Sequence, residues 1–238
     1  MPEFLARDAV RRVDALAIER YGYSGLVLME NAGRGTADVI EEKFLAAMPG
    51  HKPLVVIFCG VGNNAGDGFV IARHLDLRGY EVAIILLAPP EKLAGDALHN
   101  FRLLEKTGVK QLSLHGKDFE GTNTALQNAT VLVDALLGTG ATGALRSPYD
   151  IAVSLMTTVA NELGVPVVAV DLPTGLDADT GEPGPMVVHA AVTCTFVAKK
   201  QGFSNPAAKE STGEVVVLDI GVPESIVSEA AAEAAATD

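Results

Sequence analysis

The chain has 238 residues, of which 48% are hydrophobic, and its formal net charge is −12 at pH 7. This length can bury the core of one large α/β domain, and we predict a single domain over residues 1–238. The negative charge repels phosphate backbones and so argues against nucleic-acid binding, and no apolar run approaches the roughly 18 residues of a membrane helix.

The predicted elements change in character after residue 50. Residues 1–50 have the apolar spacing of helices that pack on a sheet. Short, continuous apolar runs follow, of the kind buried in parallel sheets: 54–59, 81–87, 129–137, 166–173, 191–197 and 214–220. Helical patterns lie between them at 68–79, 92–108 and 147–164. This alternation predicts an α/β fold with a parallel sheet covered on both faces by helices. Residues 229–238 are expected to form a helical or frayed tail without an assigned role.

The two cysteines, Cys59 and Cys194, both lie inside apolar runs. We expect two small buried side chains that form neither a disulfide framework nor a metal site. Unpaired thiols suit a reducing compartment, and the N-terminus lacks the apolar segment of a signal peptide. The sequence therefore predicts a cytoplasmic protein.

The first unusual segment, residues 60–68, follows the strand predicted at 54–59. Its glycines allow the backbone to approach a ligand closely, and the next helix would present free N–H groups to a phosphate. Asn63, Asn64 and Asp67 add side-chain donors and acceptors. The alternative is a plain turn with Asp67 as the N-cap of the helix. Two adjacent asparagines favour a ligand site, because a plain turn does not need them.

Two further segments follow strands whose last residues include a carboxylate. Asp134 precedes a glycine-rich run, 138–143, that matches G-x-G-x-x-G, and Asp171 precedes a turn containing Thr174. A carboxylate at the end of an apolar strand is costly unless it is paired or binds a cation, although Asp134 could instead cap a turn. Two neighbouring acids indicate either a shared cation or one carboxyl with a raised pKa. Oxygen ligands from Asn64, Asp134 and Thr174 would suit an alkali or alkaline-earth cation.

Several motifs together resemble the NAD(P)H-hydrate epimerase family. They are LMENAGRG (28–35), GVGNNAGDGFVIARHL (60–75), VDALLGTGATG (133–143), VAVDLPTGLDADTG (168–181), TFVAKKQG (195–202) and GEVVVLDIGVP (213–223). The resemblance extends over nearly the whole chain. It implies a Rossmann-like three-layer α/β/α sandwich, one potassium ion per subunit and a homodimer. It also implies an isomerase that interconverts the R and S forms of hydrated NADH and NADPH (NAD(P)HX) for cofactor repair.

The resemblance also assigns roles to individual residues. The implied substrate-binding residues are Asn63, Asn64, Ala65, Gly66, Asp67, Gly138, Thr139, Gly140, Ala141, Thr142, Gly143, Ala144 and Asp171. The implied potassium ligands are Asn64, Asp134 and Thr174, and Lys200 aligns with a lysine of the family. Three positions depart from the usual pattern: Ala65 replaces a glycine, Thr174 a serine and Lys199 a proline.

The substrate implied by the resemblance carries a hydroxyl at C6, beside the ring nitrogen. Either the nitrogen lone pair expels this hydroxyl or the ring opens and closes on the other face. Both routes need a group that gives and takes a proton, and Asp171 is the candidate because it ends a strand in the predicted ligand site. Because the chain ends soon after the match, we expect a separate NAD(P)HX dehydratase as functional partner.

Two other functions compete with this interpretation. A conventional NAD(P)-dependent dehydrogenase shares the fold, but its glycine fingerprint normally follows the first strand, whereas Gly138 lies late in this chain. A non-catalytic ligand-binding or dimerisation module is the other alternative. Such a module would be expected to lose the acidic residues or the asparagine segment, and this chain keeps Asp67, Asp134 and Asp171.

Overall fold

The central sheet of the computed structural model has seven strands. The structure describes residues 2–46, 52–114, 119–141 and 143–236. The strands are β2 (Leu54–Cys59), β3 (Glu81–Leu86), β4 (Lys110–Ser113), β5 (Ala129–Ala135), β6 (Val167–Val170), β7 (Val192–Phe196) and β9 (Glu214–Leu218). Their spatial order is β4-β3-β2-β5-β6-β7-β9, and every neighbouring pair is parallel. The predicted parallel α/β architecture is therefore confirmed.

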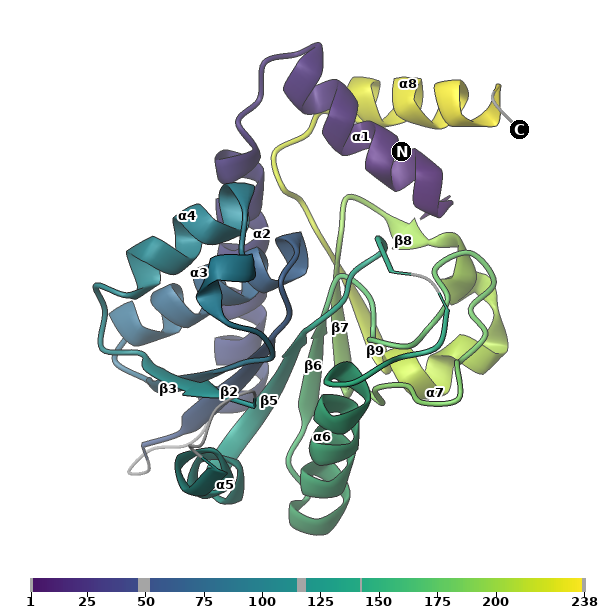
Figure 1. Cartoon of the computed structure of the whole chain (residues 1–238). Helices are drawn as coiled ribbons and strands as arrows, with labels where there is room; N and C mark the ends of the chain where they lie inside the picture. Colours follow the sequence, from purple (N-terminus) through teal and green to yellow (C-terminus); the bar gives the residue numbers. More distant parts are fainter. Residues whose placement is uncertain (1, 47–51, 115–118, 142, 237–238) are drawn as a thin grey trace.

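Helices cover both faces of this sheet (Figure 1). One face carries α2 (Gly25–Ile40), which continues as a short π-helix (Glu41–Leu45), with α3 (Asn63–Leu77) and α4 (Gly95–Leu104). The other face carries α5 (Phe119–Gln127) and α6 (Tyr149–Leu163). The remaining elements are α1 (Arg7–Glu19), α7 (Lys209–Thr212), α8 (Glu224–Ala235), β1 (Phe4–Leu5), β8 (Lys199–Lys200) and 3-10 turns at Pro90–Lys92, Gln201–Ser204 and Pro206–Ala208.

Alternation along β2 divides the core into two layers. Val55, Ile57 and Cys59 pack in the apolar cluster that contains α3, whereas Val56 and Phe58 pack in the cluster that contains α6. Successive side chains of a strand point to opposite faces, so a strand between two helical layers must be apolar throughout. This is the physical reason that the run 54–59 shows no polar alternation.

The helix α1 lies across the carboxyl edge of the sheet and packs against α8 (Figure 1). Arg12 bonds Glu233 at 2.6 Å, and Arg20 pairs with Glu229. At the other end of α1, the Arg7 N–H donates to Asp179 at 2.7 Å. Of the two expected forms of the tail from residue 229, helical or frayed, the structure shows a helix as far as Ala235, because α8 presents buried apolar side chains to α1.

The structure differs from the sequence-based elements in several places. The helix predicted from residue 68 begins five residues earlier, with Gly62 as N-cap, so the interpretation of Asp67 as N-cap is wrong. The edge strand β4 was not predicted, since three of its four residues are polar. The two-residue parallel pair of β1 with β8 was also missed, because strands this short leave no periodic signal.

Candidate active site

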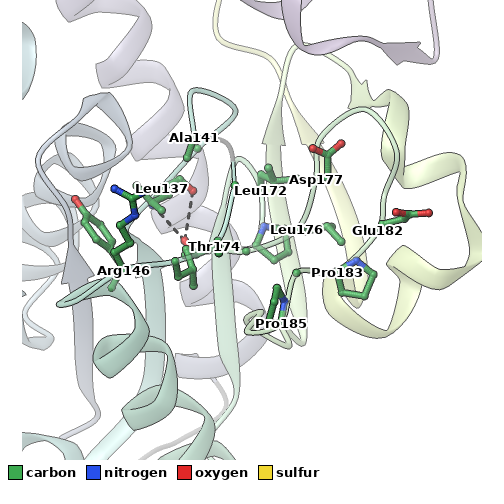
Figure 2. A pocket seen from close by; sticks show the side chains of 18 of the residues that line it. Leu137, Ala141, Arg146, Leu172, Thr174, Leu176, Asp177, Glu182, Pro183 and Pro185 are labelled. Carbon is green, nitrogen blue, oxygen red and sulfur yellow. Dashed lines mark hydrogen bonds between the residues drawn. The ribbon is translucent and has the colours of Figure 1, made fainter.

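Two cavities adjoin at the loop that follows β5. One, of about 530 Å³, lies between the carboxyl edge of the sheet, the start of α3 and the covering helix α1. The other, of about 820 Å³, lies between residues 137–149 and the loop 172–185 and is shown in Figure 2. Leu137, Gly138, Ala141 and Tyr149 line both cavities. We call them the carboxyl-edge cavity and the outer cavity.

Asp171 forms a buried ion pair in the wall of the carboxyl-edge cavity. Its Oδ1 lies 2.6 Å from Nζ of Lys200, whose side chain is fully buried, while the side chain of Asp171 is 12% exposed. Lys200 also donates to the Phe196 carbonyl at 3.3 Å. The backbone of Asp171 has φ +66°, a conformation that costs energy and recurs at functional sites. The Asp171 N–H donates to the backbone carbonyl of Cys194 at 2.7 Å. The fold therefore fixes this carboxylate at the cavity.

Three more carboxyls line the same cavity: Asp14 from α1, Asp67 from α3 and Asp96 from α4. Burial, and then the Asp171 and Asp14 charges, raise the pKa of Asp67 well above its ordinary value. Asp14 lines the cavity but is itself exposed to solvent. Desolvation and the Asp171 charge raise the pKa of Asp14 to about 6, and Lys200 opposes the shift. The cavity therefore holds carboxyls that retain protons at higher pH than free aspartate does.

Asp134 lies deeper, inside β5, and is fully buried. It accepts hydrogen bonds from the N–H and the hydroxyl of Thr174, at 2.7 and 2.8 Å, and from the Leu136 N–H at 3.2 Å. Burial raises the pKa of Asp134 to about 6, and these bonds oppose the rise. No basic side chain pairs with Asp134 in the part of the chain that the structure describes. The expected turn-binding role is therefore present, and the carboxylate still lacks a counter-charge.

The two strand-end acids have different partners among the described residues. Asp134 aligns with Ala169 across neighbouring strands, so β5 and β6 do bring the acids to one edge of the sheet. However, the counter-ion of Asp171 is Lys200. Over the described ranges, no three His, Cys, Asp or Glu side chains are grouped as a metal site would require. A cation at Asp134 would therefore depend on amide, hydroxyl and carbonyl oxygens.

The asparagine segment forms the first turn of α3. Asn63, Asn64 and Asp67 line the carboxyl-edge cavity, and the side-chain nitrogen of Asn64 is buried without a partner among the described residues. Ala65 and Gly66 line neither cavity, and their N–H groups bond to the Gly62 carbonyl at 3.1 and 3.3 Å. The methyl group of Ala65 packs in the core, and its backbone is helical, so the expected glycine is not needed there.

The loop after β5 is shared by the two cavities. Thr139 and Gly140 line the carboxyl-edge cavity, and the Thr139 N–H lies 3.4 Å from Oδ2 of Asp171. Gly143 and Ala144 line the outer cavity, and Thr142 lies outside the described residues. Thr174 ties this loop to the next one through its hydroxyl, which bonds the N–H and carbonyl of Leu137 (Figure 2).

Sequence reasoning missed Asp14 and gave Lys200 no firm role. A signal for Asp14 exists, because it lies four residues after Val10 and three before Ala17, at the edge of the buried apolar stripe of α1. The structure distinguishes the two adjacent lysines by their partners. Lys200 is buried against Asp171, whereas Lys199 pairs with Glu3 at the surface.

A parallel sheet with a ligand-sized cavity at its carboxyl edge defines this chain as a Rossmann-like α/β protein. A crystal structure of the yeast protein ynu0 has the same fold, with a TM-score of 0.76 and 23% identity over 96% of this chain and 93% of that one. The chain belongs to the family described as YjeF-related protein N-terminus, which matches residues 25–202, and thus to the NAD(P)H-hydrate epimerases that its sequence resembles.

Two curated relatives are similar over most of their length. An NAD(P)H-hydrate epimerase of Pirellula staleyi is 44% identical over 94% of this chain and 94% of the relative. An NAD(P)H-hydrate epimerase of Rhodopirellula baltica is 44% identical over 90% of this chain and 82% of the relative. A bifunctional NAD(P)H-hydrate repair enzyme of Moorella thermoacetica is 39% identical over 91% of this chain, which corresponds to 40% of the relative.

Proposed function

We propose that this protein is an isomerase that interconverts the R and S forms of NAD(P)HX. The observation that carries the proposal is the Asp171–Lys200 pair, which sits in a cavity built from the motifs shared with the epimerases. Relatives that are 44% identical over nearly the whole chain bear the name of this activity.

In this proposal the hydrated nicotinamide lies in the carboxyl-edge cavity beside Asp171. The hydroxyl at C6 loses or gains a proton as the C6–O bond breaks or forms, and Asp171 exchanges that proton. Lys200 balances the charge of the carboxylate and fixes its position. The rest of the dinucleotide crosses the loop Gly138–Ala141 toward the outer cavity, where Arg146 is the basic residue among those lining it.

We also propose one potassium ion at Asn64, Asp134 and Thr174. A fully buried carboxylate without a cationic partner fits this group, and so does a hard set of amide, hydroxyl and carboxylate oxygens. Bound there, potassium would offset the charge of Asp134 and hold the two loops together. Its chemistry is electrostatic, so proton transfer remains with the side chains of this chain.

Potassium binding has a test that does not depend on activity. At a concentration of 100 Kd, the ion should raise the free energy of unfolding by about 2.7 kcal/mol relative to choline. Asp134→Asn keeps the shape and removes the charge, and should abolish this difference. Equal unfolding temperatures in potassium and choline for the wild-type protein would remove potassium from the proposal.

We further propose that the protein acts in the cytoplasm as a homodimer, beside a separate dehydratase that consumes one form of the hydrate. Two free, buried thiols support a reducing compartment. The bifunctional names of the longer relatives support a functional link with a second repair activity. Among the described residues, no helix is long and apolar enough to cross a membrane.

The proposed activity is tested with a mixture of R and S NADHX and a dehydratase specific for the S form. Loss of the R form is followed by chromatography with and without this protein and potassium. Faster loss of the R form establishes the epimerase. Ligand binding without any acceleration, in a folded protein, would favour a non-catalytic module instead.

A further inference from the structure

We infer that Asp14 is the second proton-transferring residue of this site and acts on the face of the substrate opposite to Asp171. The inference rests on the proposed function and extends it. Inversion at C6 moves the hydroxyl from one face of the ring to the other, so oxygen must be protonated on one face and deprotonated on the other. A single carboxylate fixed on one wall serves one face only.

The structure places a carboxyl on each of two walls of the carboxyl-edge cavity. Asp171 follows β6 at the end of the sheet, whereas Asp14 belongs to α1, which lies across that end (Figure 1). Both side chains line the cavity. The apolar side chains of Leu28, Met29 and Val197 also line it and suit a flat ring.

The covering helix is held firmly enough to position a reacting group. Arg7 at its start bonds Asp177 and Asp179, and Arg11 donates to the Gly140 carbonyl at 3.3 Å. Arg12 and Arg20 on its outer side bond the acidic side chains of α8. Contacts at both ends and along the outer side keep Asp14 over the cavity without engaging its own carboxyl.

The charges around Asp14 leave it suited to donate a proton. The ionisable groups that line the cavity with it are Arg11, Asp67, Asp96, Tyr149 and Asp171, and the buried Lys200 pairs with Asp171. Desolvation and the Asp171 charge raise the pKa of Asp14 to about 6, with Lys200 opposing. Water also reaches Asp14, so its proton can be restored between turnovers. Asp67 is more deeply buried and has less access to solvent.

The step balances as an exchange of one water molecule. Protonated Asp14 gives its proton to the C6 hydroxyl, the C6–O bond breaks, and the nitrogen lone pair forms a C=N double bond as water leaves. A second water attacks C6 from the other face, the C=N electrons return to nitrogen, and the Asp171 carboxylate takes the proton from this water. The reverse reaction exchanges the two roles.

Asp14→Asn is the central variant, and Asp8→Asn is its control, because Asp8 lies on the same helix, is exposed and does not line the cavity. In the coupled assay, Asp14→Asn should lower kcat about 100-fold and change KM less than about threefold. Asp8→Asn should leave both kcat and KM at the wild-type values. The unfolding temperature of Asp14→Asn should equal or exceed that of the wild-type protein, since a carboxyl near Asp171 is removed.

The pH profile and an isotope measurement separate proton transfer from a structural role. The wild-type rate should show an inflection near pH 6 that Asp14→Glu keeps and Asp14→Asn loses. In water enriched in oxygen-18, each enzymatic inversion should place one labelled oxygen at C6.

If the wild-type protein is active, three results would overturn the role of Asp14 and leave the proposed function standing. They are wild-type kcat in Asp14→Asn, a marked loss of stability in that variant, and inversion without label. A wild-type protein that does not accelerate loss of the R form would instead overturn the proposed function, and the inference with it.

Discussion

Replacing Lys200 by methionine should destabilise the protein strongly, because it leaves the Asp171 carboxylate without its counter-ion. Charges 2.6 Å apart attract by about 6 kcal/mol at an effective dielectric constant of about 20. Desolvation of the fully buried ammonium offsets part of this attraction, and removal of one partner of a buried pair costs about 3–5 kcal/mol. Because Asp171 opens to the cavity, we expect about 3 kcal/mol, or roughly 6–12 °C in Tm.

Urea unfolding of four proteins measures this effect. Lys199→Met removes the neighbouring, solvent-exposed pair with Glu3 and should cost less than about 1 kcal/mol. Asp171→Asn combined with Lys200→Met should recover about 2 kcal/mol relative to Lys200→Met alone, since no unpaired charge remains. The reasoning is refuted if Lys200→Met costs no more than Lys199→Met, or if the double variant recovers nothing.

Three further substitutions test packing and substrate contacts. In Gly33→Ala the new Cβ would lie 2.5 Å from Cβ of Val70, a branched side chain that cannot swing away. The free energy of unfolding, measured in urea, should therefore fall by about 1–3 kcal/mol. Unchanged stability would contradict this packing. In Gly138→Ala the methyl group would lie 3.3 Å from Oδ2 of Asp171. Steady-state kinetics should show a KM at least about tenfold higher, with Tm little changed. An unchanged KM would exclude close approach of the substrate to Gly138. Arg146→Ala should weaken dinucleotide binding about tenfold in calorimetry, and equal affinity would remove the outer cavity from the substrate path.

The sheet could be predicted from the sequence because its signals are local. Each central strand is a short, continuous apolar run. Such a run is expected where helices cover both faces of a strand, because every side chain is then buried. The carboxyl-edge position of Asp134 and Asp171 followed from the same runs. The edge strand β4 could not be found in this way, because an edge position buries only one of its four side chains. The start of α3 was placed five residues late because the segment before Gly68 was interpreted as a glycine-rich turn, although Gly66 lies in the helix.

The partners of the strand-end acids could not be predicted, since they arise from contacts between distant parts of the chain. Lys200 reaches Asp171 only because β8 pairs with β1, a contact of two residues on each side. Asp14 reaches the cavity because α1 is held across the sheet by α8, at the other end of the chain, and by the contacts of Arg7 and Arg11. The sheet therefore provides one carboxylate by local sequence, and long-range packing provides its counter-ion and a second carboxyl. A reaction that inverts one carbon needs groups on two sides, and only the folded chain brings them together.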